Sequence, residues 1–323
     1  MAGDQIAADD SRVFLGLNGA RIEALSRDGK KIWSSEFGGE ISSNIIATDG
    51  SLFFATSEVA GETSKSSGSK LRWVSKDTGI TNWTMTLPDT DRHYLGLFNG
   101  AVIVVSKNGA LDAIDVRSGK VEWTRQIAEG FVGEPSFTAS SVMLATTGKQ
   151  ILDVSLKNGE INSVRKFPFA VTALSAAENY VLILGDERGN VSASNGGDKP
   201  IWTFKTGGEI SKVSAFDGHV LVASHDNFVY FLSSRNGGRI WKKRLSGRIG
   251  QISRVTERFA LISSFEEREA VLTDIANGRV AGRIVFGENE SLVARPIAAN
   301  GLIFVLTNTA AYSYSLNGCP QNK

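Results

Sequence analysis

Few residues in this chain have the type and spacing that enzyme chemistry requires. There are three histidines, His93, His219 and His225, and one cysteine, Cys319. A single cysteine can form neither an intramolecular disulfide nor a multi-cysteine metal site. His93 stands two residues after Asp91 and could act as a general base, but the sequence offers no nucleophile or second carboxylate for it. We therefore expect no catalytic residue and no metal site.

A glycine- and serine-rich stretch at residues 60–70 has the composition of a phosphate-binding loop but not its pattern. It reads AGETSKSSGSK, and the string G-x-x-x-x-G-K-[ST] occurs nowhere in the chain. Such a composition is typical of a flexible surface loop. The sequence therefore predicts no bound cofactor, and we interpret residues 60–70 as an insertion loop.

The overall composition excludes several classes of partner. The chain has 323 residues, with 35 Lys plus Arg against 34 Asp plus Glu, so its net charge is +1. A balance so close to zero gives no electrostatic basis for binding nucleic acid. No apolar run reaches the roughly 18 residues that a membrane-spanning helix needs, so we expect no direct membrane span. Other protein subunits are the expected partners.

One short pattern recurs along the whole chain. An apolar stretch leads into a polar turn, and a tryptophan often follows the turn position by four residues. The turn positions are Gly29, Gly79, Gly119, Gly159, Asp198, Gly237, Gly278 and Gly318. The tryptophans are Trp33, Trp83, Trp123, Trp202 and Trp241. The turns are 50, 40, 40, 39, 39, 41 and 40 residues apart, and the insertion at 60–70 accounts for the one long interval. Eight repeats of about forty residues indicate a closed repeat architecture.

Each repeat contains four short segments that predict β-strands. In the third repeat they are His93–Phe98, Ala101–Ser106, 110–116 and Val121–Gln126, separated by Asn-Gly and Ser-Gly turns. The sequence therefore predicts an all-β fold, an eight-bladed β-propeller of four-stranded antiparallel blades, as a single domain over residues 1–323. Only five residues follow Gly318, so we expect the last blade to lack its outer strand. We also expect the native polypeptide to extend upstream, with a strand and a lipid or membrane anchor.

The repeat pattern carries a family resemblance. The order Ala-x-Asp-x-x-x-Gly-x-x-x-Trp is clearest at Ala113, Asp115, Gly119 and Trp123, and it resembles the quinoprotein-like (PQQ-like) propeller repeat, in particular its BamB-like non-enzymatic branch. The resemblance implies that Trp33, Trp83, Trp123, Trp202 and Trp241 each dock against the neighbouring blade. Ser163 and Gly282 replace the tryptophan in two repeats.

The topology of such blades predicts a working face. Calling the strands A to D from the axis outward, the D-to-A links and the B-to-C turns emerge at the same end of each blade. The insertion at 60–70 is a B-to-C loop, and variation on one face of a repeat array marks the binding side. We therefore predict that partner-binding residues lie in the D-to-A links, namely His93, Tyr94, Phe131, Phe169 and Arg248.

Together these observations predict a non-catalytic scaffold for protein–protein interaction. The resemblance implies a subunit of a bacterial envelope or outer-membrane assembly or secretion complex, located in the periplasm or cell envelope. Two alternatives remain open. A ligand-binding sensor ectodomain would hold a small molecule in the central funnel. A PQQ-dependent dehydrogenase would bind its cofactor with calcium, but the adjacent cysteine pair typical of those enzymes is absent here.

Overall fold

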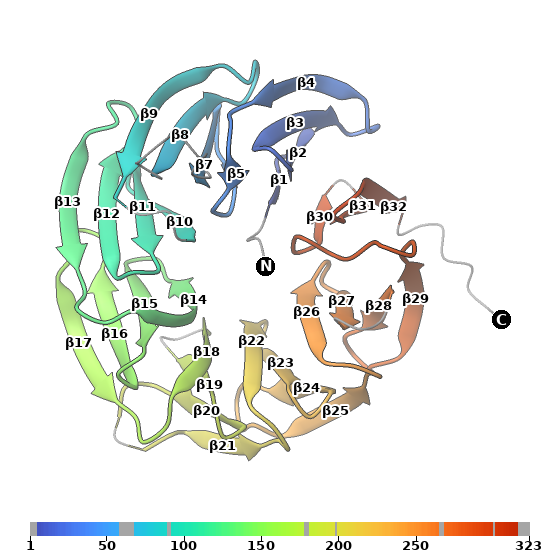
Figure 1. Ribbon diagram of the computed structural model, residues 1–323. Coiled ribbons are helices and arrows are strands. Elements are labelled where there is room, and N and C mark those ends of the chain that lie inside the picture. The colour runs from blue at the N-terminus through green and yellow to red at the C-terminus, as the bar shows by residue number, and fades with distance from the viewer. Residues whose placement is uncertain are drawn as a thin grey trace. The chain divides into compact units, whose positions relative to one another are not determined.

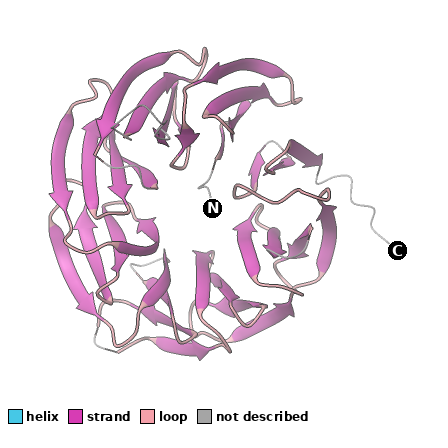
Figure 2. Cartoon of the chain, viewed as in Figure 1, coloured by secondary structure: helices cyan, strands magenta, loops and turns pink. Residues whose placement is uncertain are grey.

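The computed structural model describes residues 5–57, 68–88, 92–177, 181–197, 199–264, 268–299 and 301–315. Every regular element in these ranges is a β-strand, and no helix occurs among them (Figure 2). The strands form eight antiparallel sheets, which are the blades of a β-propeller. The predicted fold class is therefore confirmed, including a last blade that has three strands in its described part. The turn positions 198 and 318, and residues 60–67 of the insertion loop, lie outside the described residues.

The chain divides into two compact units. Residues 1–128 and 290–323 form the first, and residues 129–289 form the second. The first unit holds blades 1 to 3 and blade 8, and the second holds blades 4 to 7. Whether residues 1–323 behave as one domain stays a prediction.

The strands of the first unit follow the repeat order (Figure 1). Blade 1 contains β1 (Ile6–Ala8), β2 (Arg12–Leu17), β3 (Arg21–Ser26) and β4 (Lys31–Glu36). Blade 2 contains β5 (Glu40–Ile41), β6 (Ile46–Ala47), β7 (Ser51–Ser57), β8 (Ser69–Ser75) and β9 (Thr81–Leu87). Blade 3 contains β10 (His93–Phe98), β11 (Ala101–Ser106), β12 (Ala110–Asp115) and β13 (Val121–Gln126). Blade 8 contains β30 (Ile297–Ala299), β31 (Leu302–Leu306) and β32 (Ala311–Ser315).

The second unit consists of four complete blades (Figure 1). Blade 4 contains β14 (Phe131–Phe137), β15 (Ser141–Thr146), β16 (Gln150–Ser155) and β17 (Ile161–Lys166). Blade 5 contains β18 (Val171–Ala176), β19 (Leu182–Asp186), β20 (Asn190–Ser194) and β21 (Trp202–Lys205). Blade 6 contains β22 (Ile210–Phe216), β23 (His219–Ser224), β24 (Phe228–Ser233) and β25 (Arg239–Arg244). Blade 7 contains β26 (Ile249–Arg254), β27 (Phe259–Ser264), β28 (Glu269–Asp274) and β29 (Val280–Val285).

The turns between strands adopt the conformations that their residues favour. Asn99 and Gly100 join β10 to β11 with φ values of 46° and 83°. Two consecutive residues with positive φ make the hairpin twist that matches paired strands, and asparagine followed by glycine tolerates it best. Gly119, between β12 and β13, has φ of 68°. These local preferences explain why the strand bounds of blade 3 agree with the prediction, apart from β12, which ends one residue earlier than expected.

The core lies between the faces of neighbouring blades. All six residues of β11 are buried. Phe53 and Ala55 of β7 pack with Val102 and Val104 of β11 in one apolar cluster. A strand that is covered on both faces can be apolar throughout. This explains why polar and apolar residues do not alternate in the second strand of most repeats.

Blade 2 departs from the four-strand pattern because its inner strand is broken into β5 and β6, which both pair with β7. Between them, Ser43 Oγ accepts the Ala55 N–H at 2.7 Å. Asn44 reaches blade 3, where its side chain accepts the Leu95 N–H at 2.8 Å and donates to the Leu95 carbonyl at 3.0 Å. Side-chain hydrogen bonds thus replace the missing backbone pairs.

Candidate interaction surface

We call the end of each blade that carries the D-to-A link and the B-to-C turn the link face. In the second unit, link and turn are joined through carboxylates. Glu129 of the link before blade 4 accepts hydrogen bonds from Thr146 Oγ1 at 2.7 Å and from the Gly148 N–H at 3.0 Å. The Gly207 N–H of a later link donates to Asp226 Oδ2 at 2.8 Å. The predicted juxtaposition of links and turns is therefore present within these blades.

The Asp226 carboxylate holds this link and turn together. Burial raises its pKa, but hydrogen bonds from the Tyr230 hydroxyl, at 2.6 Å, and from the Gly207 and Phe228 N–H groups outweigh burial and hold the pKa below its ordinary value. Burial and the neighbouring carboxylate raise the pKa of Tyr230 well above its usual range. Asp226 is thus held ionised and Tyr230 neutral, and such a pair is poorly suited to proton transfer near neutral pH.

Two of the predicted partner-binding residues lie beneath the surface. His93 is fully buried, its ring Nδ1 lies 2.9 Å from Ser106 Oγ, and its backbone N–H donates to the Ser42 carbonyl at 2.8 Å. Phe131 is 5% exposed. Each is the first residue of an inner strand, and its side chain takes the inward side of the strand alternation. These two side chains therefore do not form part of the accessible link face.

The other three predicted residues are accessible. Tyr94 is half-buried, and the Arg92 guanidinium lies 5.1 Å from its ring centroid. Phe169 is also half-buried, with the Arg188 guanidinium 4.5 Å from its ring centroid. Arg248 is exposed immediately before β26. Phe169 and Arg248 lie in the links before blades 5 and 7, and Tyr94 is the second residue of β10 in blade 3.

Arg188 was not among the predicted residues. It lies in the B-to-C turn between β19 and β20, which the topology places beside the link that carries Phe169. An arginine stacked on an aromatic ring at a partly exposed site is a frequent feature of protein interfaces. The signal that could have found it is its place in the turn, because its neighbours along the chain give no hint of the ring.

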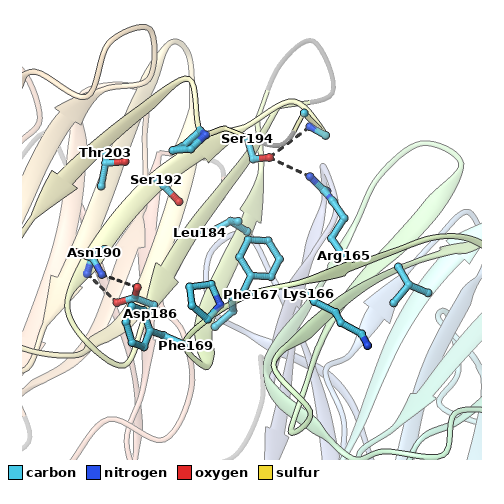
Figure 3. Close-up of a pocket in the computed structure, with 16 residues that line it drawn as sticks. Arg165, Lys166, Phe167, Phe169, Leu184, Asp186, Asn190, Ser192, Ser194 and Thr203 are labelled. Carbon is cyan, nitrogen blue, oxygen red and sulfur yellow. Dashed lines mark hydrogen bonds between the residues drawn. The ribbon is translucent and has the colours of Figure 1, made fainter.

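A cavity of about 580 Å³ opens between blades 4 and 5, within the second unit (Figure 3). Figure 3 shows Arg165 and Ser194 at one end and Asp186 and Asn190 at the other. Arg165 Nη1 donates to Ser194 Oγ at 3.0 Å. Asp186 accepts the N–H groups of Arg188 at 2.9 Å and Asn190 at 2.8 Å, so its charge is partly offset by amide donors.

The link supplies the apolar part of the same cavity through Phe167, Pro168 and Phe169. Hydroxyl groups of Ser192, Ser194 and Thr203 face it from the strands of blade 5. The arrangement combines aromatic surface with hydrogen-bonding groups, which suits binding. We find no nucleophile activated by a base among these lining residues.

The tryptophans of the repeat hydrogen-bond to the neighbouring blade wherever their contacts are described. The indole Nε1–H groups donate to backbone carbonyls in four pairs: Trp33 to Lys76 at 2.9 Å, Trp83 to Val116 at 3.0 Å, Trp202 to Ser234 at 2.7 Å and Trp241 to Ile275 at 2.7 Å. Trp123 is half-buried on β13. How much these contacts stabilise the molecule stays a prediction and is developed below.

Within the described ranges, no cluster of three or more His, Cys, Asp or Glu side chains is suitably placed to hold a metal ion. The same ranges contain no helix of the length and apolar character needed to cross a membrane.

A family model described as outer membrane protein assembly factor BamB matches the chain over residues 67–196 and 169–317. The two matches together cover more than half of the sequence. The chain belongs to this family. The match confirms the predicted resemblance to the BamB-like branch of the PQQ-like propellers. A search of curated proteins gives no significant match.

Solved structures show the same fold. BamB from Moraxella catarrhalis superposes with a TM-score of 0.72 at 13% identity, over 96% of this chain and 92% of that one. The computationally designed Ika8 protein superposes with a TM-score of 0.77 at 11% identity, over 96% of this chain and 95% of the designed chain. At these identities the likeness concerns the fold alone.

Proposed function

We propose that this BamB-family propeller is a non-catalytic scaffold that binds other protein subunits of an outer-membrane assembly complex in the bacterial envelope. The observation that carries the proposal is the family match over residues 67–317. Placement in the periplasm is part of the same proposal.

The link face supplies the surface for this role. Tyr94 with Arg92 and Phe169 with Arg188 are aromatic–arginine pairs at partly exposed positions. Tyrosine and arginine are enriched among the residues that dominate interface energies. The carboxylates that join links to turns keep the surrounding backbone fixed, so that the link face loses little conformational entropy when it binds a partner.

Affinity capture from detergent-solubilised envelopes of the native source tests the proposal. The wild-type chain is compared with Arg188→Ala on the link face and with Lys157→Ala, an exposed position in the C-to-D turn at the opposite end of blade 4. We expect subunits of the β-barrel assembly machinery with the wild type and Lys157→Ala, and less of them with Arg188→Ala. Recovery no greater than with an unrelated propeller would contradict the proposal.

A further inference from the structure

The cavity between blades 4 and 5 lies where the tryptophan pattern fails. Ser163 is the third residue of β17, as Trp33 is the third residue of β4 and Trp241 the third of β25. The strand register agrees, since Ser163 pairs with Asp153 as Trp33 pairs with Ala24 and Trp241 with Phe231. Ser163 therefore occupies the position that elsewhere carries an indole.

The next two junctions of the same unit show how an indole fills this position. Trp202 is 8% exposed and Trp241 is 9% exposed. Each ring lies against the turn glycine of the following blade, because a Cβ built on Gly237 or Gly278 would come within 2.5 Å or 2.9 Å of it. Each indole N–H donates to the backbone carbonyl three residues before that glycine. By the strand register, the corresponding carbonyl in blade 5 is that of Gly196, which lines the cavity.

No side chain of blade 4 takes the place of the missing ring. Arg165 crosses to blade 5 and donates a hydrogen bond to Ser194 Oγ at the edge of the cavity. The facing wall is also more polar than at the junction of blades 1 and 2. Val74 of β8 is fully buried in the cluster that includes Trp33, whereas the residue at the corresponding register of β20 is Ser194.

The rim of the cavity has an excess of positive charge. Arg165 and Lys166 contribute two cations, and the only carboxylate among the described lining residues, that of Asp186, is hydrogen-bonded to amide groups of its own turn. No ion pair of Lys166 occurs among the described residues. A negatively charged segment of a partner would therefore complement this rim.

We propose that this cavity receives an aromatic side chain, tryptophan or tyrosine, from an acidic segment of a partner protein. Its volume lies within the range of about 300–1,000 Å³ typical of binding sites. Phe167 and Phe169 offer apolar surface for a ring, and the hydroxyl of Ser192 offers a partner for an indole N–H or a phenol. The repeat itself shows that the position accommodates an indole, which the chain supplies at the junctions that carry a tryptophan.

The test uses 5-fluoroindole as the probe and its ¹⁹F NMR line width as the readout. The wild-type chain is expected to broaden the signal. Ser163→Trp would place an indole beside Val164 and Arg165, which line the cavity, so the broadening is expected to be lost. Lys157→Trp adds the same group in the exposed C-to-D turn of blade 4, which is not among the lining residues, and should keep the broadening.

A second variant covers the case in which Ser163→Trp does not fold. Thr203→Trp places a ring over the cavity from the exposed side of β21 and should also abolish the broadening. Absence of broadening with the wild type, or equal broadening with both cavity variants, would overturn the proposal. A Glu-Trp-Glu peptide should compete with the probe more strongly than Lys-Trp-Lys, and the reverse order would overturn the acidic part. This proposal rests on the scaffold role, because it names the chemistry of a partner protein. Binding of 5-fluoroindole is measured on the isolated chain, however, so its outcome is independent of whether complex subunits are captured.

Discussion

Replacing Trp241 by alanine should cost about 4 kcal/mol of unfolding free energy. A buried tryptophan removes roughly 150–250 Å² from water, worth about 4–6 kcal/mol at ~25 cal/mol per Å². Residual burial in the unfolded chain lowers this to about 3–5 kcal/mol. The variant also leaves the Ile275 carbonyl without its 2.7 Å hydrogen bond, and loses the stacking on Phe231, whose ring centroid is 5.2 Å away.

Urea unfolding followed by far-ultraviolet circular dichroism measures this cost without relying on tryptophan emission. Trp241→Phe keeps most of the ring and removes the N–H, so it should cost about 1–2 kcal/mol, the scale of an unsatisfied carbonyl. Ile240→Ala is the control, because Ile240 precedes Trp241 on β25 but is 46% exposed, and it should cost about 0.5 kcal/mol. If Trp241→Ala costs no more than Ile240→Ala, the tryptophan does not dock blade 6 on blade 7 and the reasoning fails.

Three further predictions concern the turns, the link face and the cavity. Gly278→Ala should cost about 2 kcal/mol of unfolding free energy in urea, because φ is 72° and the new Cβ would press on Trp241. Gly29→Ala is the control, since φ is 79° there but the space around it is open, and it should cost about 1 kcal/mol. Equal costs for the two variants would contradict the contact between Gly278 and Trp241. The pKa of Asp226 is lower in the folded chain than its ordinary 3.8, so its ionised form adds stability above about pH 4 that is lost as the pH falls toward the folded-state pKa. Asp226→Asn should therefore destabilise the chain more at about pH 7 than at about pH 3, and a cost that does not change with pH would refute this. Ser163→Trp should stabilise the chain by about 1 kcal/mol, as cavity filling commonly does; a lower urea midpoint would show that the space does not fit an indole.

The sequence predicts those parts of the fold that depend on neighbours along the chain. Asn-Gly turns and apolar runs are local, and they placed the strands of blade 3 within a residue of their observed bounds. The break between β5 and β6 was not predicted, because it depends on Asn44 bonding to Leu95 some fifty residues away. Such a pairing leaves no trace in local composition.

The candidate site was predicted less completely for a related reason. Tyr94 and Phe169 are accessible, but His93 begins a strand whose alternation turns its side chain inward. The sequence did not indicate which residues of that strand face inward and which face outward. The missing tryptophan at Ser163 was visible in the repeat, yet only packing shows that a cavity remains beside it, next to Val164 and Arg165, because neighbouring side chains could have closed it. Long-range packing thus decides which residues of the links reach the surface.

Site-specific photo-crosslinking in cells of the native source tests the scaffold role most directly. A photoreactive amino acid is placed at Phe169 on the link face and, as control, at Lys157 in the opposite turn. We predict cross-links from position 169 to subunits of the outer-membrane β-barrel assembly machinery and none to them from position 157. Equal cross-linking from both positions, or cross-links from position 169 only to unrelated proteins, would contradict it.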